Sequence, residues 1–343
     1  MVSDHWLLVE VFGGTSSEPS VMAVGKTPKR LLPLDKVLRN GRYLAEARAL
    51  IARVAAGGQP VRMTSSDGRR QLIGDPLIAP GGRVHGVYAW VGPVGAQPPP
   101  RDPAGAWYFN LTTDRVGVSH DLLDLYGVAP EGRRLEKTTA EAFGGGRLIT
   151  NADEANALSL IVNSVPGTEH QATWGVRRDD GECRAANFAC RVVAQQGPDG
   201  QLEMVARGIT HDIGPAESTP SAMLLSGVLA QQVLAAEQEP GVHRAIVNVH
   251  KLTLLRWVDD PMPGVAWELG GEHLPAIHPQ DLPLARRMAA DLPQAGRVRE
   301  VLRLRSITGG WIRVEATAHP MQLNQHTPAA LVRLTRPEGD GSP

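Results

Sequence analysis

Residues 104–128, A-G-A-W-Y-F-N-L-T-T-D-R-V-G-V-S-H-D-L-L-D-L-Y-G-V, decide how this chain is divided. Trp107, Phe109 and Leu111 alternate with other residues, a pattern that is typical of a strand with one buried face. The polar residues that follow predict a turn and a return strand over 112–118. The stretch therefore predicts the hairpin that opens a domain.

A short helix and a distant closing phrase complete this unit. Ser119 is suited to cap a helix over 120–126, and Gly127 is suited to end it. The phrase A-R-G-I-T-H-D-I at 206–213 closes the last strand. Between them the sequence predicts one more helix and three strands joined by Gly-containing turns, the helix at 153–163 and the strands at 171–178, 184–194 and 202–210.

The same order of elements recurs on both sides of this unit. Before it, the sequence predicts helices within 34–56 and strands at 6–12, 21–25, 61–64, 70–79 and 84–92. After it, the pattern is looser, with a helix at 282–292 and strands at 243–250, 254–259, 297–306, 311–318 and 329–335. Recurrence at the spacing of a whole domain favours three copies of one fold type over a solenoid. Unrelated hairpins that look alike are the alternative.

Each unit is predicted to be α+β, with one antiparallel sheet and helices on one face. The predicted parts are domains at 1–95, 105–215 and 241–337, a Pro-rich linker at 96–104, a connecting helix at 216–240 and a disordered tail at 338–343. The core of the connecting helix is expected over Ser221–Glu239, after Thr219 as cap and Pro220 at its first position. Its apolar stripe could pack on a neighbouring domain or on a second copy of the chain.

Composition and charge exclude several classes of protein. The net charge is −1, so no basic field is available to neutralise a nucleic-acid backbone. The amino terminus has an early acidic residue and a short apolar run, unlike a signal peptide. No apolar run reaches the roughly 18 residues that suggest a membrane span. We expect a cytoplasmic protein that does not bind nucleic acid and has no membrane span.

Several motifs resemble PAS or GAF domains. Residues 107–128 are similar to the opening of a PAS domain, where a hairpin leads into a short helix that ends at glycine. D-G-E-C-R at 180–184, together with the closing phrase, is similar to the last strands of that domain. H-P-Q-D at 278–281 is similar to the segment before its pocket-flanking helix. In the first unit, P-L-I-A followed by G-V-Y-A is similar to the final strands of GAF domains, so this unit resembles either type.

Over nearly its whole length the chain resembles an actinobacterial, mycobacterial-type family of stand-alone tandem PAS-GAF-PAS proteins. Such modules bind small molecules or mediate dimerisation, and they pass the result to an effector domain. No effector follows here, because Gly214-Pro215 stands where a histidine kinase would place its phospho-accepting helix, and no G-G-D-E-F or E-A-L stretch is present. The resemblance implies a partner protein that carries the effector function, and it is compatible with a homodimer.

Candidate chemistry is sparse. There is no G-x-S-x-G elbow, no phosphate loop, and no H-x-x-x-H pair among the eleven histidines. His278 could ligate a haem alone, or it could cap the helix that begins beside Pro279. We expect neither enzymatic activity nor a metal site, and the sequence specifies no cofactor.

Aromatic residues make up only 4% of the chain, so their positions are informative. In the middle unit they are expected to converge on the sheet and its helices, either as plain core or as the lining of an apolar pocket. The last unit invites the same comparison. The candidate ligand-binding residues are Trp107, Phe109, Tyr126, Phe143, Trp174, Phe188, Trp257, Trp267, His278 and Trp311.

These observations predict a non-enzymatic sensory or regulatory protein that binds an apolar small molecule, a partner protein, or both. Two alternatives stay open. One is a structural adaptor whose domain cores are filled and whose surfaces serve for docking. The other is an enzyme on a PAS-like scaffold, which would need a polar constellation that the sequence does not display.

Overall fold

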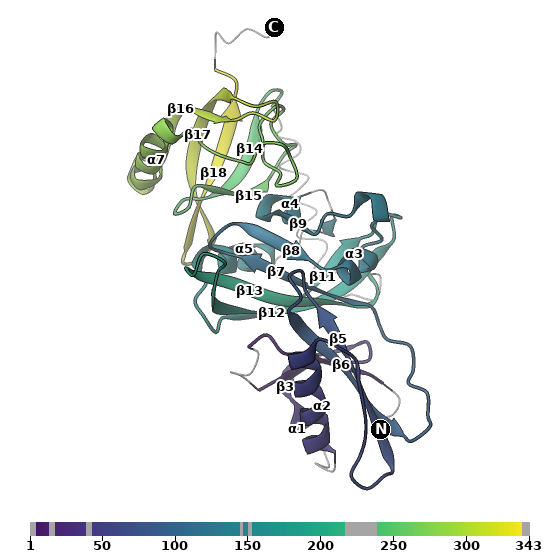
Figure 1. Cartoon of the computed structure of the whole chain (residues 1–343). Helices are drawn as coiled ribbons and strands as arrows, with labels where there is room; N and C mark the ends of the chain where they lie inside the picture. The colour runs from purple at the N-terminus through teal and green to yellow at the C-terminus, as the bar shows by residue number, and fades with distance from the viewer. Residues whose placement is uncertain are drawn as a thin grey trace. The chain divides into compact units, whose positions relative to one another are not determined.

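The computed structural model describes residues 5–13, 18–38, 43–144, 147–149, 153–216 and 239–337 (Figure 1). The predicted connecting helix over Ser221–Glu239, except its last residue, and the predicted tail lie outside these residues. The chain divides into two compact units, the first made of Met1–Thr112, Gly117–Leu135 and Val165–Thr219 and the second of Thr113–Val116, Glu136–Ser164 and Pro220–Pro343.

The first domain is a six-stranded sheet with two helices between its third and fourth strands. The strands are β1 (Leu7–Glu10), β2 (Ser20–Val24), β3 (Thr27–Pro33), β4 (Val61–Thr64), β5 (Arg70–Ile78) and β6 (Val84–Pro93), and the helices are α1 (Leu34–Val37) and α2 (Leu44–Gly57). The sequence does not predict β3, because a segment with two prolines is unusual for a strand. Gly58 ends α2 in the left-handed conformation at a φ of 61°, close to the end of the predicted helical segment at residue 56.

The middle domain has long strands and short helices. Its strands are β7 (Ala104–Asn110), β8 (Arg115–Val118), β9 (Glu136–Thr138), β10 (Leu148–Ile149), β11 (Glu169–Arg177), β12 (Cys183–Gln196) and β13 (Leu202–Pro215). The helices are α3 (His120–Leu125), α4 (Thr139–Phe143) and α5 (Glu154–Asn163). The predicted cap of α3 is confirmed, because the Ser119 side chain accepts a hydrogen bond from the Leu122 N–H. A capping box of Thr138 and Glu141 opens α4.

The third domain is a five-stranded sheet with one long helix. Its strands are β14 (His243–Asn248), β15 (Thr253–Trp257), β16 (Val298–Arg305), β17 (Trp311–Asn324) and β18 (Thr327–Thr335). The 3-10 helix η4 (Pro279–Asp281) leads into α7 (Leu282–Ala295), which buries Ala285, Met288 and Leu292 on one face. The segment between β15 and η4 has no helix or strand.

The five central strands follow one order in all three sheets. The orders are β3-β2-β1-β6-β5-β4, β10-β11-β12-β13-β7-β8-β9 and β15-β14-β18-β17-β16. In each sheet the first strand therefore lies between the second and the last, and the last is followed by the two that precede it in sequence. The first and last strands pair antiparallel, β1 with β6, β7 with β13 and β14 with β18.

In the first unit, the sheet of the first domain is covered on both faces. Leu7 and Val9 pack with the helix α2, whereas Leu8 and Trp6 pack with the sheet of the middle domain. This division follows from the two-residue period of a strand. Small residues allow the two sheets to approach, since a Cβ on Gly86 would lie 2.6 Å from Cδ1 of Ile209.

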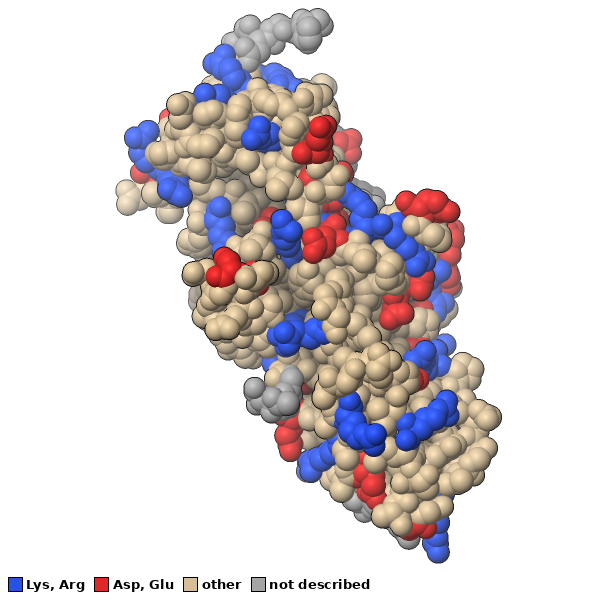
Figure 2. All heavy atoms as spheres, in the orientation of Figure 1, with Lys and Arg blue, Asp and Glu red and all other residues tan. Residues whose placement is uncertain are grey.

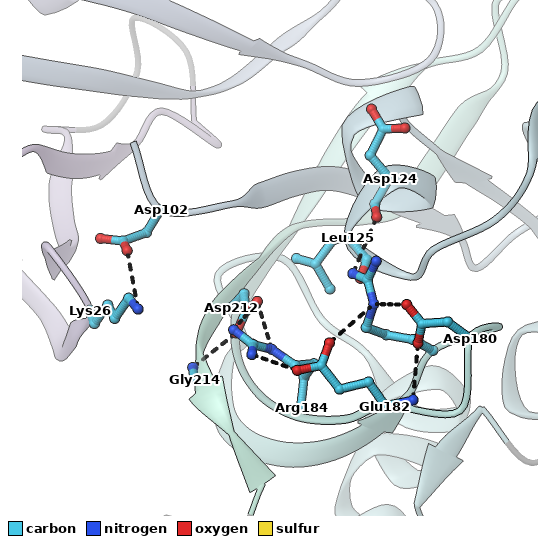
Figure 3. Close-up of polar contacts among 10 residues, drawn as sticks. Lys26, Asp102, Asp124, Leu125, Asp180, Glu182, Arg184, Asp212 and Gly214 are labelled. Atoms are coloured by element: carbon cyan, nitrogen blue, oxygen red, sulfur yellow. Dashed lines mark hydrogen bonds and ion pairs between the residues drawn. The ribbon is translucent and has the colours of Figure 1, made fainter. Parts of the chain in front are cut away.

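A carboxylate of the closing phrase fixes the last strands of the middle domain (Figure 3). Both guanidinium nitrogens Nε and Nη2 of Arg184 donate to the carboxylate of Asp212, at 2.8–3.2 Å. Arg184 Nη1 also contacts Glu182 at 2.9 Å. Arg184, the last residue of the motif at 180–184, thus ties β12 to β13.

In the second unit, the helix α5 is joined to the β17–β18 hairpin. Asn324 Nδ2 donates to Ser159 Oγ at 2.6 Å, and Asn163 Nδ2 donates to Thr327 Oγ1 at 2.9 Å. Ser159 and Thr327 are buried. Buried polar groups that satisfy one another in this way specify one docking geometry.

We expect Gly105→Ala to destabilise the protein. A Cβ at this position of β7 would lie 2.2 Å from Cα of Leu122, so α3 would have to move away from the sheet. Overpacking of this kind costs about 1–3 kcal/mol of folding free energy. The loss would be measured by urea unfolding followed through tryptophan fluorescence. Gly57→Ala is the control, because nothing lies within 4 Å of its Cβ; equal stability of the two variants would contradict the packing argument.

Candidate functional site

An apolar cavity of about 400 Å³ lies in the second unit, lined mainly by residues of the third domain. Residues two apart on one strand, such as Val314, Ala316 and Ala318 of β17, line it together because alternate side chains share a face. The helix α7 covers it with one side, and the segment between β15 and η4 covers it with Trp267 and its neighbours. Further lining residues are Ala245, Val247, Leu254, Trp257, Val265, Leu274, Ile277, Ala285, Met288, Leu292, Leu302, Leu304, Ala330, Val332 and Leu334.

Alanines give the cavity its volume. Ala245, Ala285, Ala316 and Ala330 are buried at positions that face it from three strands and from α7. Protein cores are otherwise packed as densely as organic crystals, so a filled core would need larger side chains here. The volume of about 400 Å³ equals that of roughly 13 water molecules and falls in the range of sites for small organic ligands.

The cover of the cavity is held from the start of α4, which belongs to the same unit. Thr138 Oγ1 donates to the carbonyl of Trp267 at 3.3 Å. The N–H of Leu269 donates to Glu141 Oε2 at 2.8 Å, and that oxygen also accepts from the N–H of Thr138. The two residues that cap α4 therefore also fix the segment that closes the cavity.

A polar edge interrupts the apolar lining at the turn between β7 and β8. Thr113, Asp114 and Arg115 line the cavity there. Asp114 has a φ of 58° and accepts a hydrogen bond from Thr139 Oγ1 at 2.5 Å. Burial raises the pKa of Asp114 to about 6, although this hydrogen bond and the charge of Lys251 act in the opposite direction. Burial also lowers the pKa of Lys251.

Trp257 brings an unsatisfied donor to the cavity wall. Its ring lies edge-on to Trp267 with centroids 6.4 Å apart, and both rings line the cavity. The buried Nε1–H of Trp257 has no hydrogen-bond partner in the described part of the chain. Leaving such a group unpaired costs about 1–3 kcal/mol, which a ligand acceptor within reach would offset.

Four of the ten candidate residues from the sequence lie in or beside the last domain, and the structure separates them into two pairs. Trp257 and Trp267 line the cavity, whereas His278 and Trp311 do not. The His278 and Trp311 rings pack at 4.6 Å, and His278 Nδ1 accepts from the N–H of Gln280. His278 therefore caps the 3-10 helix η4, which is one of the two roles that the sequence leaves open for it.

The middle-domain candidates form an aromatic cluster of their own. Centroid distances are 5.4 Å from Trp107 to Phe109, 6.3 Å from Trp107 to Phe188 and 5.6 Å from Trp174 to Phe188. Trp107 Nε1 donates to Thr210 Oγ1 at 2.9 Å. These rings contact one another and do not line the cavity of the third domain.

The two remaining candidates lie at helix ends. Tyr126 is half-buried at the C-cap of α3, and Phe143 is the last residue of α4. The sequence gives no signal for the residues that shape the cavity most, because Asp114 stands in an ordinary turn sequence and buried alanines occur in every core. Only their position around a hollow distinguishes them.

The described residues also bear on metal ligation, surface charge and membrane spans. Within the described residues, no group of three or more His, Cys, Asp or Glu side chains could hold a metal ion. Basic and acidic side chains are interspersed over the face of the molecule shown in Figure 2. None of the described helices is long and apolar enough to cross a membrane.

We expect Asp114 to titrate near pH 6, well above an ordinary aspartate. Because the folded state holds this proton more tightly than the unfolded chain, the contribution of Asp114 to stability is lost as the pH rises through about 6. Asp114→Asn should remove the carboxyl resonance with that midpoint from an NMR titration. It should also flatten the fall in melting temperature between about pH 4 and 7.

Asp281→Asn serves as the control, because the pKa of Asp281 is shifted in the opposite direction to that of Asp114. Its hydrogen bonds with Arg303 lower the pKa of Asp281 to about 2, so its contribution is lost only as the pH falls below the ordinary aspartate range. The slope between about pH 4 and 7 should therefore stay as in the parent protein. A wild-type Asp114 midpoint near 4 would contradict the description of this edge as desolvated.

The comparisons with known proteins place the chain in a family. Models described as Rv3651-like, N-terminal, Rv3651-like, middle domain, and Rv3651-like, C-terminal domain match residues 5–100, 103–212 and 227–341. The crystal structure of an uncharacterized protein from Mycobacterium tuberculosis is similar at 29% identity and a TM-score of 0.84, over 98% of this chain and 97% of that chain. A search of curated proteins gave no match.

Two sensory proteins are similar only at low TM-scores. One is a sensory box histidine kinase/response regulator from Burkholderia thailandensis, with 18% identity over 38% of this chain and 92% of that chain and a TM-score of 0.25. The other is an RNA-binding light-oxygen-voltage receptor, with 13% identity over 68% and 95% and a TM-score of 0.24. Scores this low carry no argument. The three family models, in contrast, follow one another along almost the whole sequence, and the chain belongs to the Rv3651-like family.

Proposed function

We propose that this protein is a non-enzymatic sensory or regulatory protein of the cytoplasm whose third domain binds an apolar or amphipathic small molecule. The observation that carries the proposal is the cavity of about 400 Å³ with its nearly continuous apolar lining. An apolar ligand would gain roughly 25 cal/mol for each Å² of its surface that it removes from water there. The polar edge at Asp114 would receive a head group.

The domain type is part of the same proposal. The order of hairpin, helices and three-strand meander occurs three times, and in the middle domain it begins with the residues that resemble a PAS opening. We therefore assign the three domains to the PAS/GAF type. Since no effector motif is found in the sequence, the proposal includes a partner protein that carries the effector function.

Occupancy of the cavity would be transmitted through its cover. A ligand that displaces Trp267 or Leu269 would disturb the hydrogen bonds of both residues to Thr138 and Glu141. Those two side chains also cap α4, so the change would reach the start of that helix. Caps contribute about 1 kcal/mol to helix stability, which suffices to shift a marginal helix of five residues.

One feature supports the alternative function, a structural adaptor with filled domain cores. In the middle domain the aromatic rings of Trp107, Phe109, Trp174 and Phe188 contact one another, although only Trp174 among them is buried. In the third domain the buried alanines favour ligand binding over a filled core. The choice between the two functions therefore depends on whether the third domain takes up a ligand.

Ala316→Phe should block ligand binding by filling the cavity. Ala316 is buried on β17 and faces the hollow, so the added ring would occupy the space that a ligand needs. We expect N-phenyl-1-naphthylamine, a neutral fluorescent probe, to bind the parent protein and to lose at least about tenfold in affinity, equivalent to 1.4 kcal/mol, in the variant. Fluorescence titration measures this, and the melting temperature shows that the variant is folded.

Ala52→Phe is the matched control for this substitution. Ala52 is exposed on α2 of the first domain and does not line the cavity, so probe affinity should be unchanged. Equal binding by the parent protein and by folded Ala316→Phe would contradict the proposed site. A parent protein that binds no apolar probe, and that carries no small molecule in native mass spectrometry, would support the adaptor instead.

A further inference from the structure

Lysine is rare in this chain, and its distribution is uneven. The sequence contains thirty arginines but only five lysines. Three of the five, Lys26, Lys29 and Lys36, line one hollow of about 610 Å³ in the first domain. Where arginine is the prevalent cation, the gathering of lysines in one place indicates that their particular chemistry is used there.

Strand irregularity brings these side chains to one hollow. Thr27 and Lys29 share a face of β3 because they are two residues apart. Leu32 should point to the opposite face, yet it lines the same hollow. Between them Leu31 has a φ of 44°, which is a rare conformation for a bulky residue and breaks the alternation of the strand. Backbone outliers of this kind often occur at binding sites.

The Pro-rich linker forms another wall of the hollow, within the same unit. Trp6 Nε1 donates to the carbonyl of Pro99 at 2.7 Å, and the Tyr88 hydroxyl donates to the carbonyl of Asp102 at 2.6 Å. These bonds fix Pro100 and Asp102 against the first domain, where both line the hollow. This wall of the hollow is therefore preformed in the absence of a ligand.

The charges in the hollow are positive in excess. Lys26 Nζ lies 4.0 Å from the Asp102 carboxylate, as Figure 3 shows. Lys29 and Lys36 have no ion-pair or hydrogen-bond partner for their ammonium groups among the described residues, and His5 adds an imidazole to the lining. Structural pairing in this chain uses arginine, for example Arg191 with the buried Glu10 at 3.0 Å. The two unpaired lysines thus serve no evident structural purpose.

We propose that this hollow binds a small organic molecule that carries a phosphate group. Lysine ammonium groups are compact point charges on flexible stems, and they bind phosphate without the fixed geometry that arginine demands. Val24, Leu32, Val37 and Pro100 also line the hollow and offer an apolar surface for the organic part. This site is separate from the cavity of the third domain and does not depend on the function proposed for it.

Phenyl phosphate is the probe that tests this site, because it joins one phosphate to one apolar ring. Isothermal titration calorimetry at low ionic strength should show binding to the full chain and weaker binding of inorganic phosphate, which lacks the ring. Lys29→Gln with Lys36→Gln should reduce the affinity for phenyl phosphate by more than about tenfold, because two charge-assisted contacts are lost. Circular dichroism and the melting temperature verify the fold, and Lys36→Gln alone, at an exposed position, repeats the test with less risk to the fold.

The control pair is Arg53→Gln with Arg62→Gln. Both arginines are exposed in the first domain and neither lines the hollow, so the net charge changes equally while the site is kept. Affinity should stay within about twofold of the parent value. Equal weakening by both pairs would overturn the proposal in favour of a general field effect. The absence of phenyl phosphate binding would overturn it as well, and so would binding only to vesicles that contain phosphatidylglycerol.

Discussion

The pairing of the first strand of each sheet with its last is the constraint on which the rest of the structure depends. In the third domain, β14 pairs with β18 so that Ala245 lies opposite Val332 and Val247 opposite Ala330. All four residues line the cavity, so the wall of the proposed site exists only once this long-range pairing has formed. In the first domain, β1 lies between β2 and β6 and is buried on both faces, which explains its three consecutive apolar residues. Its last residue, Glu10, is also buried and pairs with Arg191.

Local chemistry made the strand order along the sequence predictable. The Gly-containing turns of the meanders and the Ser119 cap act over a few residues, and sequence patterns record such interactions directly. The strand β3 escaped prediction because its conformation depends on pairing with β2 and on the unusual backbone of Leu31. The roles of Thr138 and Glu141 in holding the cover of the cavity could not be predicted from the sequence for a similar reason. They look like an ordinary capping box, and their bonds to Trp267 and Leu269 join residues more than 120 positions apart.

The candidate site was partly predictable from the sequence. Aromatic residues are rare in this chain and could be singled out, whereas alanine and aspartate are too common to indicate a site. Trp257 and Trp267 were found through the scarcity of aromatic residues. His278 and Trp311 belong to the same set, yet they pack on each other away from the cavity. The cavity exists because small side chains leave space unfilled. The sequence pattern of an alanine that lines a cavity is the same as that of an alanine packed against a neighbour. Asp114 was missed because its burial results from tertiary structure and not from its turn sequence.

The bonds between α5 and the β17–β18 hairpin have a consequence for synthesis on the ribosome. Asn163 and Thr327 are separated by 164 positions, so the helix emerges long before its partners are translated. Until then the polar groups that it later buries must be satisfied by water. The nascent third domain, in turn, cannot complete its own packing from its own segment alone. This unit therefore acquires its final form only after β17 and β18 have been translated.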